Sequence, residues 1–151
     1  MRDDLDKIMN VMAAAFDPQW GEAWNRRQVS DSLLLSNTHY TLVDGAGNTP
    51  AAETDAAGFT LVRAAPGEEE LLLVAVSPEA RGRGLGRKLL TSVICDARSR
   101  GAEKLFLEMR YNNPAQHLYS SLGFAPIGRR PQYYKLPDGQ RIDAITFGLS
   151  I

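Results

Sequence analysis

Apolar and polar residues follow helical spacing in some parts of the chain and strand spacing in others. Near the start, helical spacing joins Leu5, Ile8, Met9, Met12 and Phe16. A second helix is predicted from Trp24 to Leu35, a third from Leu85 to its stop at Gly101, and a short fourth after Pro114. Strands are predicted at 39–43, 58–64, 69–76 and 104–110. The segment 133–149 predicts a closing hairpin that turns at Asp138-Gly139.

This order of elements predicts the α/β class, with a mixed sheet flanked by helices. The run at 69–76 is almost continuously apolar, which favours a central strand buried on both faces. No repeat divides the chain, so residues 1–151 are expected to form a single domain. The composition of the stretch 44–57 predicts a mobile surface loop, and the sequence gives it no role.

Composition narrows the classes of partner. The chain has 151 residues, 44% of them hydrophobic, with a net charge of -1, so neither nucleic acid nor an anionic membrane is expected as a main partner. Cys95 is the only cysteine, which rules out an intramolecular disulfide and suits a reducing compartment. The acidic N-terminus and the absence of an apolar run of membrane-spanning length lead us to expect a cytoplasmic protein. A monomer or weak dimer is expected.

The loop "RGRGLG", residues 81–86, follows a predicted strand and opens a predicted helix. Backbone N–H groups that converge at a helix N-terminus bind anions, and glycine leaves room for a phosphate to approach. We interpret the loop as a pyrophosphate site. The other reading is a basic loop that only caps the helix.

Two nucleotide alternatives can be compared with this loop. A nucleotide-hydrolysing P-loop ends in Gly-Lys-Ser/Thr, whereas Gly86 is followed by Arg87-Lys88-Leu89, so that reading fails. A dinucleotide fingerprint fits Gly82 and Gly84, with Glu108 downstream. However, Arg87 stands where its third glycine would allow a close helix-strand approach, and this alternative stays open with little support.

With further motifs, the loop resembles the GNAT N-acetyltransferase family. Residues 81–86 fit its Q/R-x-x-G-x-G/A signature, and "LFLEMR", the "NxxAxxLYxxxGF" pattern at 112–124, "YY" at 133–134 and "DAI" at 143–145 continue the match. The set is most similar to the bacterial ribosomal-protein-alanine N-acetyltransferases, the RimI branch. The resemblance extends from about Leu71 to the end and implies a GNAT fold, with a mostly antiparallel central sheet whose central strands splay apart.

The resemblance also implies a co-substrate and the residues that hold it. Acetyl-CoA would be the acyl donor, attacked directly by an amine in a ternary complex. Backbone groups of Val74, Ala75 and Val76 would bind pantetheine and polarise the thioester carbonyl. The pyrophosphate would lie on Arg81, Gly82, Arg83, Gly84, Leu85, Gly86 and Arg87. Asn112 would bond the pantetheine arm, but it lies one residue closer to Glu108 than the family pattern has it, so Asn113 competes for this role.

Glu108 and Tyr119 take the places of the family's general base and general acid. An α-amine, with a pKa of about 7.7–8.0, must lose a proton before it attacks a thioester, and a tyrosine hydroxyl can protonate the departing sulfur. The simpler readings are a Glu108 that is exposed or paired with Arg110, and a Tyr119 that belongs to the core. His39 and His117 have no cysteine partners at ligand spacing, so no metal site is predicted.

The acceptor is the least determined part of the prediction. Resemblance implies the N-terminal alanine of a small-subunit ribosomal protein, entering between the loop at 16–24 and Tyr133-Tyr134. The sequence departs from the branch in this region, because "FDPQWGEAW" lacks the usual "PW" pair and "RRPQYY" has one extra residue. A small-molecule amine, a lysine side chain, or an acyl-CoA sensor without catalysis remain the alternatives.

Overall fold

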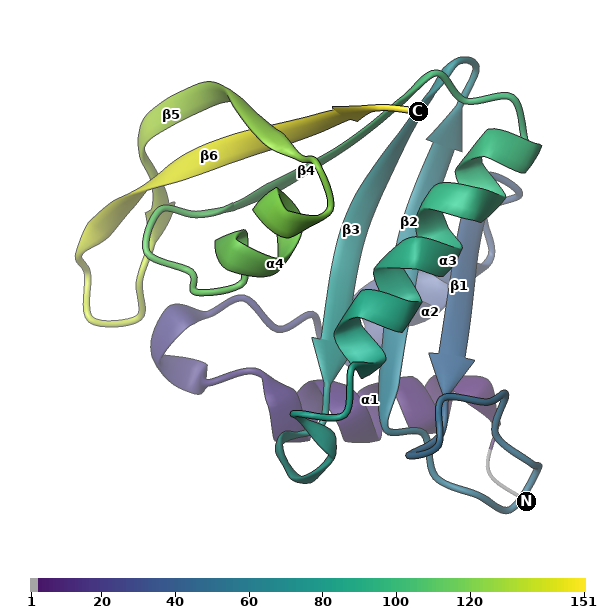
Figure 1. Cartoon of the computed structure of the whole chain (residues 1–151). Coiled ribbons are helices and arrows are strands. Elements are labelled where there is room, and N and C mark those ends of the chain that lie inside the picture. The colour runs from purple at the N-terminus through teal and green to yellow at the C-terminus, as the bar shows by residue number, and fades with distance from the viewer. Residues whose placement is uncertain (1–2) are drawn as a thin grey trace.

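A computed structural model describes residues 3–151 as a six-stranded sheet with helices on both faces (Figure 1). The helices are α1 (Asp4–Ala15), α2 (Arg26–Leu33), α3 (Leu85–Ser99) and α4 (Gln116–Ser121), with short 3-10 turns at Pro18–Trp20 and Pro78–Ala80. The strands are β1 (Thr38–Val43), β2 (Gly58–Ala65), β3 (Glu68–Val76), β4 (Lys104–Arg110), β5 (Ala125–Lys135) and β6 (Arg141–Ser150). The predicted element order and the α/β class are confirmed.

The strands lie in the order β1-β2-β3-β4-β6-β5, and every neighbouring pair is antiparallel except β3 and β4. Helices α3 and α4 cover the face toward the viewer in Figure 1, and α1 and α2 cover the other. One hydrophobic core lies between α3, α4, β4 and β6. A second core lies between α1, α2, β2 and β3, and its buried residues include Ile8, Met12, Val29, Phe59 and Leu61.

The two central strands separate partway along their length. The parallel ladder pairs Glu68–Leu71 of β3 with Lys104–Leu107 of β4 and goes no further. Each strand keeps its outer neighbour to its end, since β2 pairs with β3 up to Val76 and β6 pairs with β4 up to Arg110. The splayed central strands predicted from the family resemblance are therefore present.

An irregularity in β3 sets which side chains face the opening. Leu61 of β2 pairs with Leu73 and Val62 pairs with Leu71, so Leu72 is an extra residue in β3. Because side chains alternate between faces, this bulge changes which face the following residues take. Leu73 and Ala75 join the α1 core, while Val74 packs toward the core beneath α3.

Three expectations differ from the structure in detail. The strand β3 is central, but it is not fully buried on both faces, because buried and half-buried residues alternate along it. The buried residues change face at the bulge, from Leu71 in the α3 core to Leu73 and Ala75 in the α1 core. The closing hairpin begins earlier than predicted, since β5 starts at Ala125. The loop 44–57 is tied to the body of the protein, where Lys7 Nζ donates to Ala51 O at 2.8 Å and Arg83 Nη1 to Gly45 O at 3.4 Å. Among residues 3–151, no helix has the length and apolar character needed to cross a membrane.

Candidate active site

Two cavities meet where β3 and β4 separate. One, of about 580 Å³, extends from the splay toward the glycine-rich loop and the start of α4, and the other, of about 350 Å³, opens toward α2 and β5. We call them the loop-side cavity and the hairpin-side cavity. The side chains or backbone that line both are Phe16, Glu22, Val74, Asn113 and Tyr119. A molecule in one cavity can therefore contact a molecule in the other at this junction.

The glycine-rich loop forms the N-terminus of α3 as the sequence predicted. Gly84 is the N-cap with φ of 76°, and Gly82 has φ of 81°, a left-handed conformation that other residues adopt at a cost. The first helical bond runs from Lys88 N–H to Gly84 O at 3.0 Å, so the N–H groups of the preceding turn have no partner within the helix. Gly86 lines the loop-side cavity, while the Leu85 side chain is buried.

The three arginines of this loop bond to different parts of the protein. Arg81 lines the loop-side cavity and bridges two elements, donating to Val76 O at 3.2 Å and to Ala15 O at 3.1 Å. Arg83 donates to Glu79 O as well as to the 44–57 loop. Arg87 Nη2 donates to Ser121 Oγ at 2.8 Å, which links α3 to the end of α4. These contacts hold the loop in place, and the exposed loop remains cationic.

Val74, Ala75 and Val76 all line the loop-side cavity. The β3–β4 ladder has ended before them, so their β4-facing backbone groups point into the opening and not into a ladder. Of the two asparagines, Asn113 lines both cavities and accepts from Ala115 N–H at 2.9 Å. Asn112 is exposed and accepts from Arg110 Nη1 at 2.6 Å. The geometry places Asn113, the competing candidate, at the junction.

Glu108 lines the hairpin-side cavity, with 19% of its side chain exposed. Its Oε2 accepts from Thr146 Oγ1 at 3.3 Å and lies 3.1 Å from Arg130 Nε. The simpler reading that paired it with Arg110 is wrong, because Arg110 pairs with Glu22. Glu108 is thus a half-buried carboxylate held by β6 and β5 at the wall of a cavity.

Tyr119 belongs to the core and to the cavity wall at once. Its ring packs against Phe124 and Phe147, with centroids 5.8 and 6.5 Å away, and only 6% of the residue is exposed. Burial, and then the negative charge of Glu22, raise the pKa of Tyr119 above its ordinary value of 10. The phenol is therefore protonated throughout the neutral range and can act as a donor.

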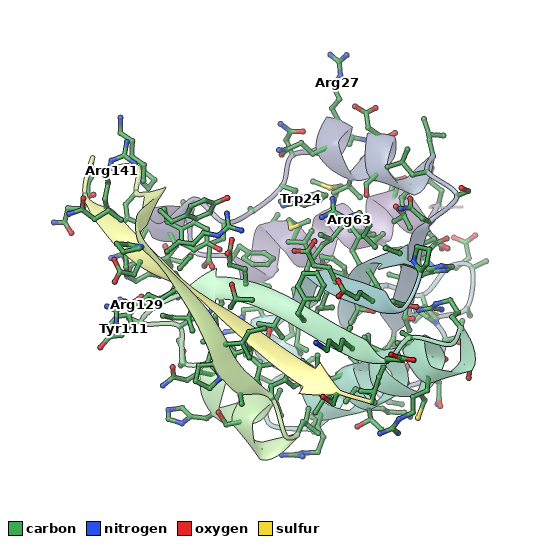
Figure 2. The ribbon with its side chains drawn as sticks, turned by 90° about the horizontal axis from the view of Figure 1, so that it is seen from above. Trp24, Arg27, Arg63, Tyr111, Arg129 and Arg141 are labelled. Carbon is green, nitrogen blue, oxygen red and sulfur yellow. The ribbon has the colours of Figure 1, made fainter. Side chains whose placement is uncertain are left out.

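The β5–β6 hairpin contributes one residue, Tyr134 of β5, to the lining of the hairpin-side cavity. Burial and the charges of Glu108 and Glu22 raise the pKa of Tyr134, which lines the cavity, to about 12. On the outer surface, the Arg129 guanidinium carbon lies 5.0 Å from the Tyr111 ring centroid, and Figure 2 shows these two side chains together, with Arg141 farther along the hairpin. Trp24 lies further in, beside α2, and lines the cavity.

Comparison with known proteins identifies the family to which the chain belongs. The model of the acetyltransferase (GNAT) family matches residues 5–124. The chain is 39% identical to the [ribosomal protein bS18]-alanine N-acetyltransferase of Haemophilus ducreyi, over 99% of this chain and 95% of that protein. The crystal structure of the ribosomal-protein-S18-alanine N-acetyltransferase from Escherichia coli has a TM-score of 0.79 at 29% identity, covering 98% of this chain and 88% of that one. Arabidopsis thaliana NAA60 in complex with acetyl-CoA shares the fold, with a TM-score of 0.79, 18% identity and coverage of 98% and 93%.

The chain belongs to the GNAT family of acetyltransferases. It is an acyltransferase, and acetyl-CoA is its co-substrate. Within the part of the chain that the structure describes, no group of three or more His, Cys, Asp or Glu side chains could hold a metal ion.

Proposed function

We propose that this chain transfers the acetyl group of acetyl-CoA to the N-terminal α-amine of a protein, and that the acceptor is the N-terminal alanine of a small-subunit ribosomal protein. The observation that carries the reaction is the junction of the two cavities. Tyr119 lies at that junction and Glu108 lies in the hairpin-side cavity beyond it. Relatives of similar length are named as alanine N-acetyltransferases of ribosomal protein bS18, which supports the choice of acceptor.

Acetyl-CoA would occupy the loop-side cavity. Its pyrophosphate would lie on the exposed N–H groups and positive charge of the loop from Arg81 to Arg87. Its pantetheine arm would take the place of the missing ladder along Val74–Val76, with Asn113 bonding the arm. The thioester carbonyl would reach the junction, where a β3 backbone N–H stabilises the oxyanion that forms during attack.

The acceptor would enter the hairpin-side cavity with its α-amine at the junction. Glu108 takes the ammonium proton, directly or through one water, and the neutral nitrogen attacks the thioester carbon. As the C–S bond breaks, Tyr119 donates its hydroxyl proton to the sulfur. The second proton that the attacking nitrogen loses returns through water to the Tyr119 oxygen, and Glu108 releases its proton to solvent. The transfer leaves an amide and free CoA, with no covalent intermediate on the protein.

The first prediction concerns Gly84. We expect Gly84→Ala to lower the free energy of unfolding by about 1–2 kcal/mol, because alanine is strained at a left-handed φ. The variant should also lose most of the rise in melting temperature that saturating acetyl-CoA gives the wild type. Thermal unfolding with and without acetyl-CoA measures both effects.

Gly67→Ala is the matched control. Gly67 also has a left-handed φ, 80°, and open space beside it, but it lies in the turn between β2 and β3. It should lose similar stability and keep the full acetyl-CoA shift. Two results would overturn the assignment of the loop to the pyrophosphate of acetyl-CoA. One is that both variants lose the acetyl-CoA-induced rise in melting temperature equally, and the other is that NAD raises the melting temperature of the wild type as much as acetyl-CoA does.

The second prediction concerns the acceptor. A short peptide that begins with alanine should be acetylated with a far higher kcat/KM than an Nα-blocked peptide containing lysine, or than spermidine. The α-amine pKa is about 7.7–8.0 and that of lysine about 10.4, so the α-amine loses its proton more easily. Steady-state acetylation of the three acceptors by the wild type gives the comparison.

The outcomes separate the proposed function from its alternatives. Preference for the blocked peptide or for spermidine would point to a lysine or small-molecule acetyltransferase. Binding of acetyl-CoA without turnover on any amine would point to a sensor. A panel of peptides with different first residues then tests alanine against the other residues.

A further inference from the structure

Glu22 is the one carboxylate that lines both cavities in the described part of the chain. It lies in the loop between the 3-10 turn at Pro18–Trp20 and α2, and 20% of its side chain is exposed. Glu108, by comparison, lines only the hairpin-side cavity. Glu22 is therefore the carboxylate placed at the point where an acetyl group and an amine would meet.

Arg110, at the end of β4, holds Glu22 in this position. Arg110 Nε donates to Glu22 Oε1 at 3.1 Å, and Arg110 Nη1 donates to Asn112. The guanidinium carbon lies 3.9 Å from the centroid of the Trp20 ring, a cation–π contact, and only 8% of Arg110 is exposed. Two residues of the same loop, Trp20 and Glu22, thus contact the Arg110 guanidinium and fix the loop to the splayed end of β4.

The contact with Arg110 leaves the carboxylate facing the junction. Within residues 3–151, the hydrogen bond of Glu22 is made through Oε1, so Oε2 can accept from a ligand. Both cavity tyrosines are affected by the negative charge of Glu22, which contributes to the raised pKa values of Tyr119 and Tyr134. Glu22 therefore contributes negative charge to both cavities that it lines.

An acceptor amine reaches this space as a cation. At neutral pH most of an α-amine with a pKa of about 7.7–8.0 is protonated, and an ammonium that leaves water needs a charged or polar partner. Glu108 already pairs with Arg130 and accepts from Thr146 through Oε2, which leaves its Oε1 to take the proton. A second carboxylate at the junction would hold the ammonium while Glu108 takes its proton.

We infer that Glu22, oriented by Arg110, binds the α-ammonium group of the acceptor through a charge-assisted hydrogen bond and so selects cationic amines for acetylation. The inference rests on the proposed function and adds a specificity-determining residue to it. Glu22 keeps its negative charge throughout the reaction, and the proton leaves through Glu108. The two carboxylates therefore affect different kinetic constants.

The test is the kinetics of Glu22→Gln with a peptide that begins with alanine. At about pH 6.5, where the amine is protonated, the KM for the peptide should rise by roughly 10-fold or more, the effect of losing one hydrogen bond to a charged group. The turnover number should stay within about threefold and the KM for acetyl-CoA should not change. At about pH 9.5 the amine is neutral, so the KM ratio of variant to wild type should approach one.

Two further variants separate binding from structure. Glu22→Asp keeps the charge and should raise the peptide KM less than Glu22→Gln does. Glu70→Gln removes a carboxylate that pairs with Arg63, away from both cavities, and should leave the peptide KM unchanged. Thermal unfolding of each variant shows whether the fold is kept.

Two results would overturn the inference while the proposed function stands. One is a KM ratio that is the same at both pH values, which a structural role would give. The other is a large fall in turnover with an unchanged KM, which would make Glu22 a proton acceptor. A wild type that does not acetylate the peptide at all would instead refute the proposed function.

Discussion

Glu108→Gln is expected to lower the turnover number by roughly 10²–10⁴-fold, the range that general acid-base catalysis typically contributes. Glutamine has the same shape as glutamate and can still accept from Thr146 Oγ1, but it cannot take a proton from the acceptor. The KM for acetyl-CoA should stay close to that of the wild type, because Glu108 lies outside the loop-side cavity. Pre-steady-state and steady-state acetylation of an alanine-starting peptide measure the chemical step and the turnover.

The alkaline side of the pH profile provides the control for this expectation. If Glu108 serves to deprotonate the amine, the rate of the glutamine variant should recover partly as pH rises above the amine pKa of about 8. Glu70→Gln should keep wild-type turnover at every pH. Wild-type turnover of Glu108→Gln at neutral pH would show that the glutamate is only structural.

Tyr119→Phe is expected to lower the turnover number by roughly 10²-fold or more, since it removes the proton donor for the sulfur. Phenylalanine keeps the ring contacts with Phe124 and Phe147, so the free energy of unfolding should change little. This substitution tests directly whether Tyr119 is more than a core aromatic. Turnover and thermal unfolding of the same preparation give both numbers.

The raised pKa of Tyr119 determines how the wild-type rate should depend on pH. A phenol with a pKa above its ordinary value of 10 is protonated, and therefore able to donate, at every pH below about 10. The wild-type rate should then rise as the amine deprotonates and show no fall below about pH 10 from loss of the Tyr119 proton. A fall near pH 8, absent from Tyr119→Phe, would mean that the tyrosine ionises early and would contradict the burial seen here.

The elements could be predicted from the sequence because each carries its own local signal. Gly84 and Gly101 mark the ends of α3, Asp138-Gly139 turns the hairpin, and the apolar periods locate the helices and strands. The placement of Glu108 on a cavity wall follows from alternation along β4. These features depend on neighbours within a few residues.

The remaining features depend on pairs that are distant in the chain. The Glu22–Arg110 pair joins positions 88 residues apart, and the Thr146 contact with Glu108 spans 38. No period or motif links such residues, so the sequence offers a pairing of Glu108 with Arg110, two residues along the strand, as one simpler reading, and that pairing is wrong. The choice between Asn112 and Asn113 stays open in the sequence for a related reason, since a turn after β4 decides which side chain lines the cavities, and in the structure Asn113 does so. Two tryptophans in the 16–24 loop were the available signal that this loop packs against something.

The short ladder between β3 and β4 also determines how the sheet can come apart. It is the shortest seam in the sheet, and nothing beyond Leu71 and Leu107 extends it, so opening fluctuations should begin there. Acetyl-CoA placed between the strands would close this seam as a substitute for the absent backbone bonds. The lifetime of the folded enzyme would then rise and fall with the supply of its own co-substrate, and molecules without it would be the first that proteases reach.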